Sequence, residues 1–404
     1  MKQALSLSGN HFLMQKLRFG FSILFLFLSF IGRSQFTVTG LVLDSSSREP
    51  LVAASVFCQN TTSGAYTNKQ GEFSLSLKSG GYDLIISYTG YQTQTIRVNE
   101  ASKLEVLLIK EDKSMSEVII KSSNEVADGW TKYGDFFIKN FIGATPNAAQ
   151  CTLLNPEVLK FFYYKRSNKL KVLATDALQI SNKALGYDMR YQLDSFVYYY
   201  NTDINLYKGY CLYTEMQGDD SLKRVWATAR AKAYTGSKLH FMRSYYDSTL
   251  LEDGWIIDML DENSDRKFSK VKDMYDSSYY NLITYTRDSI VYRRDSTGVD
   301  SANNIIYRTD TIVHQVLTGQ VDVEIYYPRK ISITYTKKRP EPEYIKKMNL
   351  PKGVPYQVSY IDIKDWIAIT ENGYYYEQKS WVNQGYWSWK NLADQLPYDY
   401  LLPN

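Results

Sequence analysis

The sequence predicts a mainly β protein of the α+β class, in which an N-terminal β-sandwich precedes a larger antiparallel-sheet domain with a few helices. Three observations predict it. Short, β-prone apolar runs separated by Gly, Pro, Asn and Ser fill residues 37–98, as in a small sandwich of about seven strands. Apolar and polar residues alternate strictly over 187–194, which indicates a half-exposed antiparallel strand. Aromatic residues fall at helical spacing over 130–141.

The first 34 residues have the composition of a secretory signal peptide. They contain four basic and no acidic residues, with an apolar run over 19–31 and a small-x-small cleavage site at 32–34. The apolar run is shorter than the roughly 20 residues that a transmembrane helix needs. We therefore expect an exported mature chain from Gln35 without a transmembrane segment. Met14 is an alternative start to Met1, because it gives more ordinary signal proportions.

Charge argues against nucleic acid as a partner. The full chain has 47 basic and 43 acidic residues, a formal net charge of +4. The four basic residues of the signal account for this excess, so the mature chain has a formal charge of zero. Nucleic-acid binding normally needs a basic surface that displaces counterions. We therefore expect no nucleic-acid partner.

Four motifs in order characterise the N-terminal sandwich. They are G-x-V-x-D from Gly40, P-L-x-x-A-x-V from Pro50, G-x-[YF]-T-[ND]-x-x-G-x-F from Gly64 and S-Y-x-G-Y from Ser87. In these motifs residues 36–110 resemble the carboxypeptidase-regulatory-like domain, a transthyretin-like β-sandwich that occurs in some metallocarboxypeptidases and many Gram-negative envelope proteins. The resemblance implies a scaffold module and a place in the periplasm, at the outer membrane or on the cell surface.

The rest of the chain divides into a linker, expected over residues 111–126, and an α+β domain of unknown function over 127–404. Residues 118–120 are an apolar stretch within the linker that is compatible with one added strand. The expected elements of the larger domain are helices over 127–141, 222–234, 237–250 and 387–396, strands over 158–216 and 255–260, a long hairpin within 279–335, and a turn at Asn372-Gly373.

The mature sequence lacks the motifs of common catalytic centres. Neither of its two histidines, His240 and His314, begins the H-x-x-E motif of zinc carboxypeptidases. It also contains no H-E-x-x-H, G-x-S-x-G or G-x-x-x-x-G-K-[ST] sequence. Asp261, Asn263 and Asp265 match the first ligands of a calcium loop, but basic residues replace its turn glycine and its bidentate glutamate. We therefore expect no catalytic residue, no cofactor and no metal site.

Three cysteines, Cys58, Cys151 and Cys211, lie far apart in the sequence. At most one intramolecular disulfide is possible, and its pairing is open. Without a C-x-x-C pair, their favoured interpretation is that of small buried hydrophobic residues.

The C-terminal tail contains the densest group of aromatic residues in the chain. Exposed aromatic rings stack on sugars, whereas buried ones complete a core, and the core interpretation is the favoured one. If the tail binds a ligand, the candidate residues are Trp381, Tyr386, Trp387 and Trp389.

The second region also resembles, in its LNPEVL, ALGY, YTGSKLHF, ENGYYYE and GYW segments, a family of exported bacterial proteins that carry this sandwich, and the resemblance implies no activity. Three functions stay open. The preferred one is a non-catalytic envelope protein, with the sandwich as a docking or spacer module and the C-terminal domain binding an envelope protein or glycan. The second is a carboxylate-dependent hydrolase of envelope polysaccharide. The third is a structural or assembly factor of the outer envelope.

Overall fold

The computed structural model describes residues 35–78, 81–111, 124–261, 264, 266–299, 305–376 and 380–403, and for 284–321 the backbone alone. The predicted signal peptide, residues 112–123 of the predicted linker, and Asn263 and Asp265 of the calcium-like loop lie outside the described residues. In the part of the chain that is described, no helix is long and apolar enough to cross a membrane.

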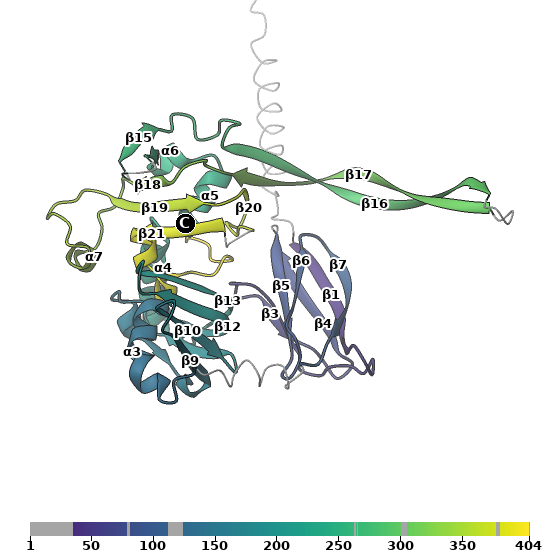
Figure 1. Cartoon of the computed structure of the whole chain (residues 1–404), viewed down its shortest axis with the longest axis horizontal. Coiled ribbons are helices and arrows are strands. Elements are labelled where there is room, and N and C mark those ends of the chain that lie inside the picture. Colours follow the sequence, from purple (N-terminus) through teal and green to yellow (C-terminus); the bar gives the residue numbers. More distant parts are fainter. Residues whose placement is uncertain are drawn as a thin grey trace, which may run out of the picture.

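Seven strands form the predicted N-terminal sandwich (Figure 1). They are β1 (Gln35–Asp44), β2 (Ser55–Cys58), β3 (Gly64–Tyr66), β4 (Glu72–Lys78), β5 (Tyr82–Ser87), β6 (Gln94–Val98) and β7 (Ser102–Leu108). One sheet has the order β4-β1-β7 and the other β3-β2-β5-β6. Phe73, Leu75 and Leu77 alternate along β4 with exposed neighbours and are buried between the sheets. This alternation is the period-2 pattern expected of a strand with one face in a core.

A six-stranded sheet follows, preceded by the predicted helix α3 (Gly129–Phe141). Its strands are β8 (Cys151–Leu153), β9 (Leu159–Tyr164), β10 (Lys169–Ala174), β11 (Leu178–Asn182), β12 (Tyr187–Tyr199) and β13 (Ile204–Glu215). Two short 3-10 helices, η1 (Ala148–Gln150) and η2 (Pro156–Val158), lie before and after β8. β11 and β10 pair with the first and second parts of β12, and β13 pairs along its length. The strict alternation predicted at the start of β12 is confirmed, because Tyr187, Met189, Tyr191 and Leu193 are all buried.

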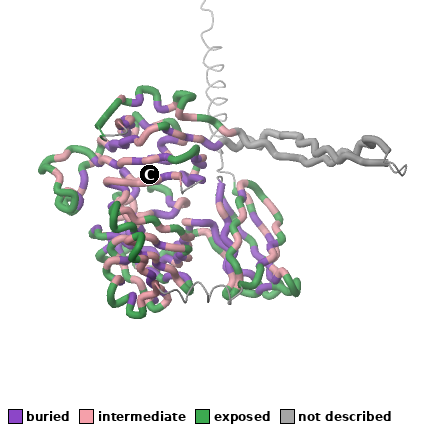
Figure 2. The backbone as a smooth tube through the Cα atoms, viewed as in Figure 1, coloured by how far each residue is buried: buried purple, intermediate pink, exposed green. Residues whose placement is uncertain are grey.

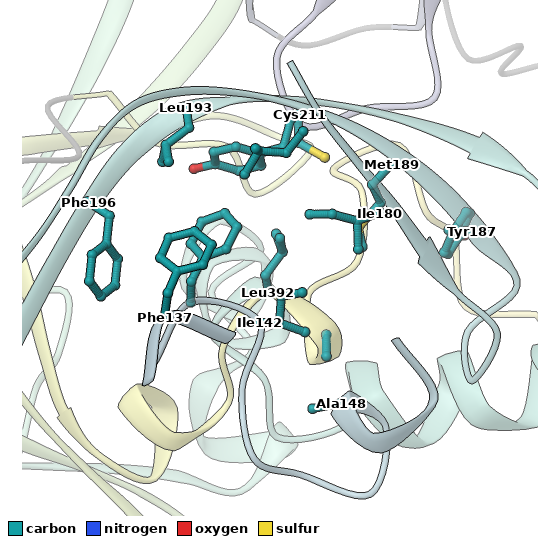
Figure 3. Close-up of a cluster of buried hydrophobic side chains, with 14 of the residues drawn as sticks. Phe137, Ile142, Ala148, Ile180, Tyr187, Met189, Leu193, Phe196, Cys211 and Leu392 are labelled. Atoms are coloured by element: carbon teal, nitrogen blue, oxygen red, sulfur yellow. The ribbon is translucent and has the colours of Figure 1, made fainter. Parts of the chain in front are cut away.

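Helix α3 packs its aromatic face on this sheet. Phe137 and Phe141 are fully buried, and the Phe137 ring lies 5.2 Å from that of Phe196 on β12. Figure 3 shows this contact together with Cys211 of β13 in the same core. Phe137 and Phe141 of the aromatic stripe therefore serve packing, whereas Trp130 at its start is 39% exposed.

A second core is formed by α5 (Lys238–Tyr246), α6 (Leu250–Asp253) and strands of two further sheets. The preceding helix, α4 (Asp220–Tyr234), packs on the first core through Tyr234. The five-stranded sheet contains, in spatial order, β15 (Lys267–Lys270), β14 (Trp255–Leu260), β18 (Ile331–Tyr335), β19 (Gln357–Ile363) and β21 (Trp381–Gly385). Trp255, at 1% exposure, occupies this core with the rings of Phe241 and Tyr335. Figure 2 shows how buried residues gather along these strands.

The predicted long hairpin consists of β16 (Tyr280–Val299) and β17 (Ile305–Ile325). The two strands form an antiparallel ladder with two register shifts, and the base of β17 pairs with β20 (Ile367–Ile369). Figure 1 shows the two strands side by side along their length. The predicted turn at Asn372-Gly373 follows β20, with Gly373 at a φ of 82°.

Two helix predictions need correction. The helix expected over 237–250 ends at Tyr246, because Ser248 adopts a φ of 59° before α6 begins. The closing helix expected over 387–396 is wrong. Its place is taken by α8 (Tyr386–Trp389) and η4 (Leu392–Asp394), after the short α7 (Pro342–Lys347) earlier in the chain. The reason is tertiary, since the Ala393 N–H donates to the Ile142 carbonyl beyond α3 instead of continuing a helical ladder.

Candidate functional site

The turn between β2 and β3 joins the sandwich to the six-stranded sheet. The Asn60 N–H donates to the Cys211 carbonyl at 2.7 Å, and the Tyr213 N–H donates to the Thr61 carbonyl at 2.9 Å. Thr61 is fully buried, and Asn60 adopts a φ of 54°, a conformation that asparagine tolerates. The turn therefore adds a short parallel bridge to β13 and satisfies backbone groups that an edge strand leaves open.

The C-terminal tail holds the same turn from its other side. The Tyr398 N–H donates to the Asn60 carbonyl at 2.8 Å. The Asp399 carboxylate accepts from the Thr62 N–H and from its hydroxyl, at 2.9 and 2.5 Å. The sandwich, the six-stranded sheet and the tail thus meet at this turn, residues 59–62.

A second contact lies beside the turn. The Tyr374 hydroxyl donates to Asp83 Oδ2 at 2.6 Å, and burial raises the pKa of this hydroxyl well above its ordinary value. The Arg97 guanidinium lies 3.4 Å above the centre of the Tyr376 ring, a favourable cation–π arrangement. These bonds fix the sandwich to the loop that follows β20.

We expect the Asp399→Ala variant to lose about 1–2 kcal/mol of unfolding free energy, because it removes charge-assisted hydrogen bonds at a partly solvated site. Urea denaturation measures the loss, and hydrogen exchange at Thr61–Ser63 should accelerate. Asp128→Ala is the matched control, since Asp128 is exposed and makes no capping hydrogen bond at α3. Equal stability of the two variants would contradict a tail that holds the turn.

A cavity of about 100 Å³ lies at this junction. Its wall is formed by Asn60 of the sandwich, Tyr213 of β13, the connection from α4 to α5, Lys338, and parts of the tail between Gly373 and Tyr398. That volume is enough for several water molecules or a small ligand group. The cavity is therefore built from segments far apart in the sequence.

Lys238, the first residue of α5, borders the cavity. Its ammonium donates to the Tyr375 hydroxyl at 2.8 Å and lies 4.9 Å from the centre of that ring. Burial lowers the pKa of the ammonium below its ordinary value. The N-terminal end of a helix also disfavours a positive charge. The packing around Lys238 thus holds its ammonium in an environment that disfavours the charged form.

Two other lysines at the cavity have clear structural partners. The Lys338 ammonium donates to the carbonyls of Lys232 and Thr235 at 2.8 and 3.2 Å, where a cation stabilises the C-terminal end of α4. Lys390 forms ion pairs with Glu341 at 3.1 Å and Asp394 at 3.3 Å.

The four candidate aromatic residues of the tail are all buried, between 2% and 6% exposed. Tyr386 and Trp387 form part of the cavity wall, and all four belong to the second core. The Trp387 indole donates to the Gly236 carbonyl at 2.9 Å, and the Tyr386 hydroxyl bonds to Glu341. The four residues thus lie in one core. Trp381 and Trp389, unlike the other two, are not among the described residues of the cavity wall.

Sequence reasoning missed Asn60, Lys238 and Tyr398 as cavity residues. The one local signal was the cap of α5, since Ser237 accepts a hydrogen bond from the His240 N–H as expected. Nothing in the sequence places Asn60 beside Tyr398, because more than three hundred residues separate them.

The cysteines are free thiols. Cys58 and Cys211 are buried, Cys151 is half-buried, and burial raises the pKa of Cys151 to about 12. Such thiols are protonated at neutral pH and pack as small hydrophobic groups.

Comparison with known proteins identifies the N-terminal module. Residues 38–120 match the family model of the CarboxypepD_reg-like domain, so the predicted resemblance is confirmed. The chain is 33% identical over 119 residues to TonB-dependent receptor SusC of Bacteroides thetaiotaomicron, a match that covers 28% of this chain and 12% of that protein. It is 29% identical over 103 residues to TonB-dependent receptor P39 of Formosa agariphila, covering 25% of this chain and 10% of that protein. The chain thus spans a small part of these relatives.

Solved structures resemble the chain weakly. A type II cohesin–X-dockerin complex from Acetivibrio cellulolyticus is 26% identical with a TM-score of 0.17, over 19% of this chain and 59% of that chain. A DUF3823 family protein from Parabacteroides merdae is 10% identical with a TM-score of 0.17, over 47% of this chain and 85% of that one. A putative membrane-associated protein from Bacteroides fragilis is 9% identical with a TM-score of 0.15, over 84% and 92% of the two chains.

Proposed function

We propose that this chain is a non-catalytic protein of the bacterial envelope whose C-terminal region binds a saccharide in the junction cavity. The sandwich is its docking module and contributes Asn60 to the cavity wall. The CarboxypepD_reg-like domain and the partial similarity to two TonB-dependent receptors support the envelope location. The observation that carries the proposal is a cavity that the sandwich, β13, α5 and the tail form jointly.

The character of the cavity wall favours a saccharide over a protein chain. Four aromatic residues line the cavity, and Lys238 and Asn60 add polar groups. The aromatic residues are Tyr375, Tyr386, Trp387 and Tyr398. Small-molecule sites combine an apolar wall with a few polar groups in this way. A folded protein partner would instead bury a broad surface of several hundred Å² on each side.

The acidic groups of the site favour binding over hydrolysis. Asp394 is the one carboxylate among the described residues at the cavity. Its two oxygens already accept from the Thr145 hydroxyl at 2.6 Å and the Asn147 amide at 2.9 Å. A glycoside hydrolase generally needs two carboxylates flanking the sugar bond.

Isothermal titration of the mature chain with a panel of neutral and acidic oligosaccharides tests the proposal. We expect one saccharide class to bind, and Tyr398→Ala to weaken its affinity at least about tenfold, a loss near 1.4 kcal/mol. Tyr356→Ala is the control, because Tyr356 is 42% exposed and lies outside the cavity wall. Release of new reducing ends during incubation, or equal weakening by both variants, would contradict the proposal.

A further inference from the structure

The basic residues of the cavity are not equivalent. Lys390 is paired with carboxylates, and Lys338 is held by carbonyls at the end of α4. Lys238 forms no ion pair with a described residue, and the acceptor of its hydrogen bond is the neutral Tyr375 hydroxyl. An ammonium has three donors, so Lys238 retains donors that Tyr375 alone does not satisfy.

A partly buried ammonium without an anionic partner is unfavourable. Removing a charge from water is costly unless hydrogen bonds and an opposite charge replace the lost hydration. The site at Lys238 offers the hydroxyl and the ring of Tyr375 and the N-terminal end of a helix. A negative group in the cavity would supply the missing charge and would also suit the helix end.

We infer that the cavity binds its saccharide through a carboxylate, so that the ligand class is an acidic sugar such as a uronate, with the Lys238 ammonium as its ion partner. This inference rests on the proposed function and names its ligand. Of the four lysines at the cavity, Lys232 is exposed, Lys390 is paired with carboxylates and Lys338 is held by two carbonyls. The remaining charge, that of Lys238, matches the single charge of a carboxylate. The aromatic wall, including Trp387 and Tyr398, accommodates the apolar face of the sugar ring.

The substitution that tests the ion pair is Lys238→Met. Methionine keeps the length of the side chain and removes a buried charge, so the variant should be at least as stable as the wild type at neutral pH. Lys223→Met is the matched control, because Lys223 is exposed on the surface of α4. Lys238→Gln is a second variant at the same position, which removes the charge and keeps a donor for the Tyr375 hydroxyl, in case Lys238→Met does not fold.

Titration calorimetry of the mature chain with glucuronate, glucose and inorganic phosphate gives the readout. We expect glucuronate to bind the wild type and Lys223→Met equally, and Lys238→Met at least about tenfold more weakly, with glucose weaker than glucuronate on the wild type. If Lys238→Met does not fold, weaker glucuronate binding by Lys238→Gln supports the ion pair, and unchanged binding overturns it.

The other outcomes separate the two proposals. Glucose binding as tightly as glucuronate, or unchanged glucuronate affinity in Lys238→Met, would overturn the acidic-sugar inference and leave the saccharide site standing. Phosphate binding more tightly than glucuronate would overturn the carboxylate as the ligand group. Absence of binding by glucuronate and by every saccharide of the panel would overturn the proposed function as well.

Discussion

Replacing Trp255 with alanine is expected to lower the unfolding free energy by about 3–5 kcal/mol, the range for large aromatic side chains removed from a core. Trp255 is 1% exposed. The centre of its ring lies 4.5 Å from the ring centre of Tyr335 and 5.3 Å from that of Phe241. Its indole also donates to the Ser244 hydroxyl at 3.2 Å. The variant loses this packing and leaves a cavity in the second core.

Urea denaturation followed by circular dichroism measures this loss, because ΔG falls linearly with urea concentration. Trp366→Ala is the control, since Trp366 is 36% exposed and its one described ring contact, with Tyr326, lies at 5.6 Å. We expect the control to lose less than about 1.5 kcal/mol. Similar losses in the two variants would show that Trp255 does not organise this core.

Acidification from pH 6.5 to 4 is expected to cost about 3 kcal/mol of stability through His240. Burial lowers the pKa of His240 to about 4. The ring packs against Trp255 and Tyr335, and its Nδ1 accepts from the Gly236 N–H at 3.2 Å. His240 binds a proton near pH 6.5 in the unfolded chain and only near pH 4 in the folded chain. Its contribution to the unfolding free energy is therefore complete above pH 6.5, falls between pH 6.5 and 4 and levels off below pH 4.

Three charged residues near His240 also shift its pKa. Asp253 raises this pKa, and Lys337 and Arg243 lower it. The pKa of Asp247 is raised by burial, so its protonation opposes the loss slightly at the acid end. Comparison of His240→Gln with the wild type over this pH range isolates the histidine. The variant should show a shallower profile, in which the remaining loss near pH 4 comes from carboxyls such as Glu341 and Asp253, whose pKa values lie below their ordinary values. Parallel profiles would contradict a buried neutral His240.

Local patterns predicted the elements whose residues interact with sequence neighbours or with one sheet face. The alternation from Tyr187 identified β12, the aromatic spacing from Trp130 identified α3, and Ser237 identified the start of α5. The family motifs located the sandwich. In each case the period or the cap is a property of a short segment.

The closing helix and the cavity depend on distant partners instead. Residues 387–396 have a helical pattern, but hydrogen bonds to the segment after α3 divide them into two short turns. Asn60 looks like an ordinary turn residue, and its contact with Tyr398 exists only once both segments have folded. The surroundings of His240 also depend on distant partners, because aromatic rings from β14 and β18 cover it.

Hydrogen exchange of the mature chain with and without saturating glucuronate tests the central claim most directly. The claim is that the sandwich turn, α5 and the tail form one ligand site. We predict slower exchange in three segments, the turn 59–62, the segment 235–242 that leads into α5, and the tail 392–398, with little change on the outer strands of the sandwich. Slower exchange confined to another surface, or no change in any of these three segments, would contradict it.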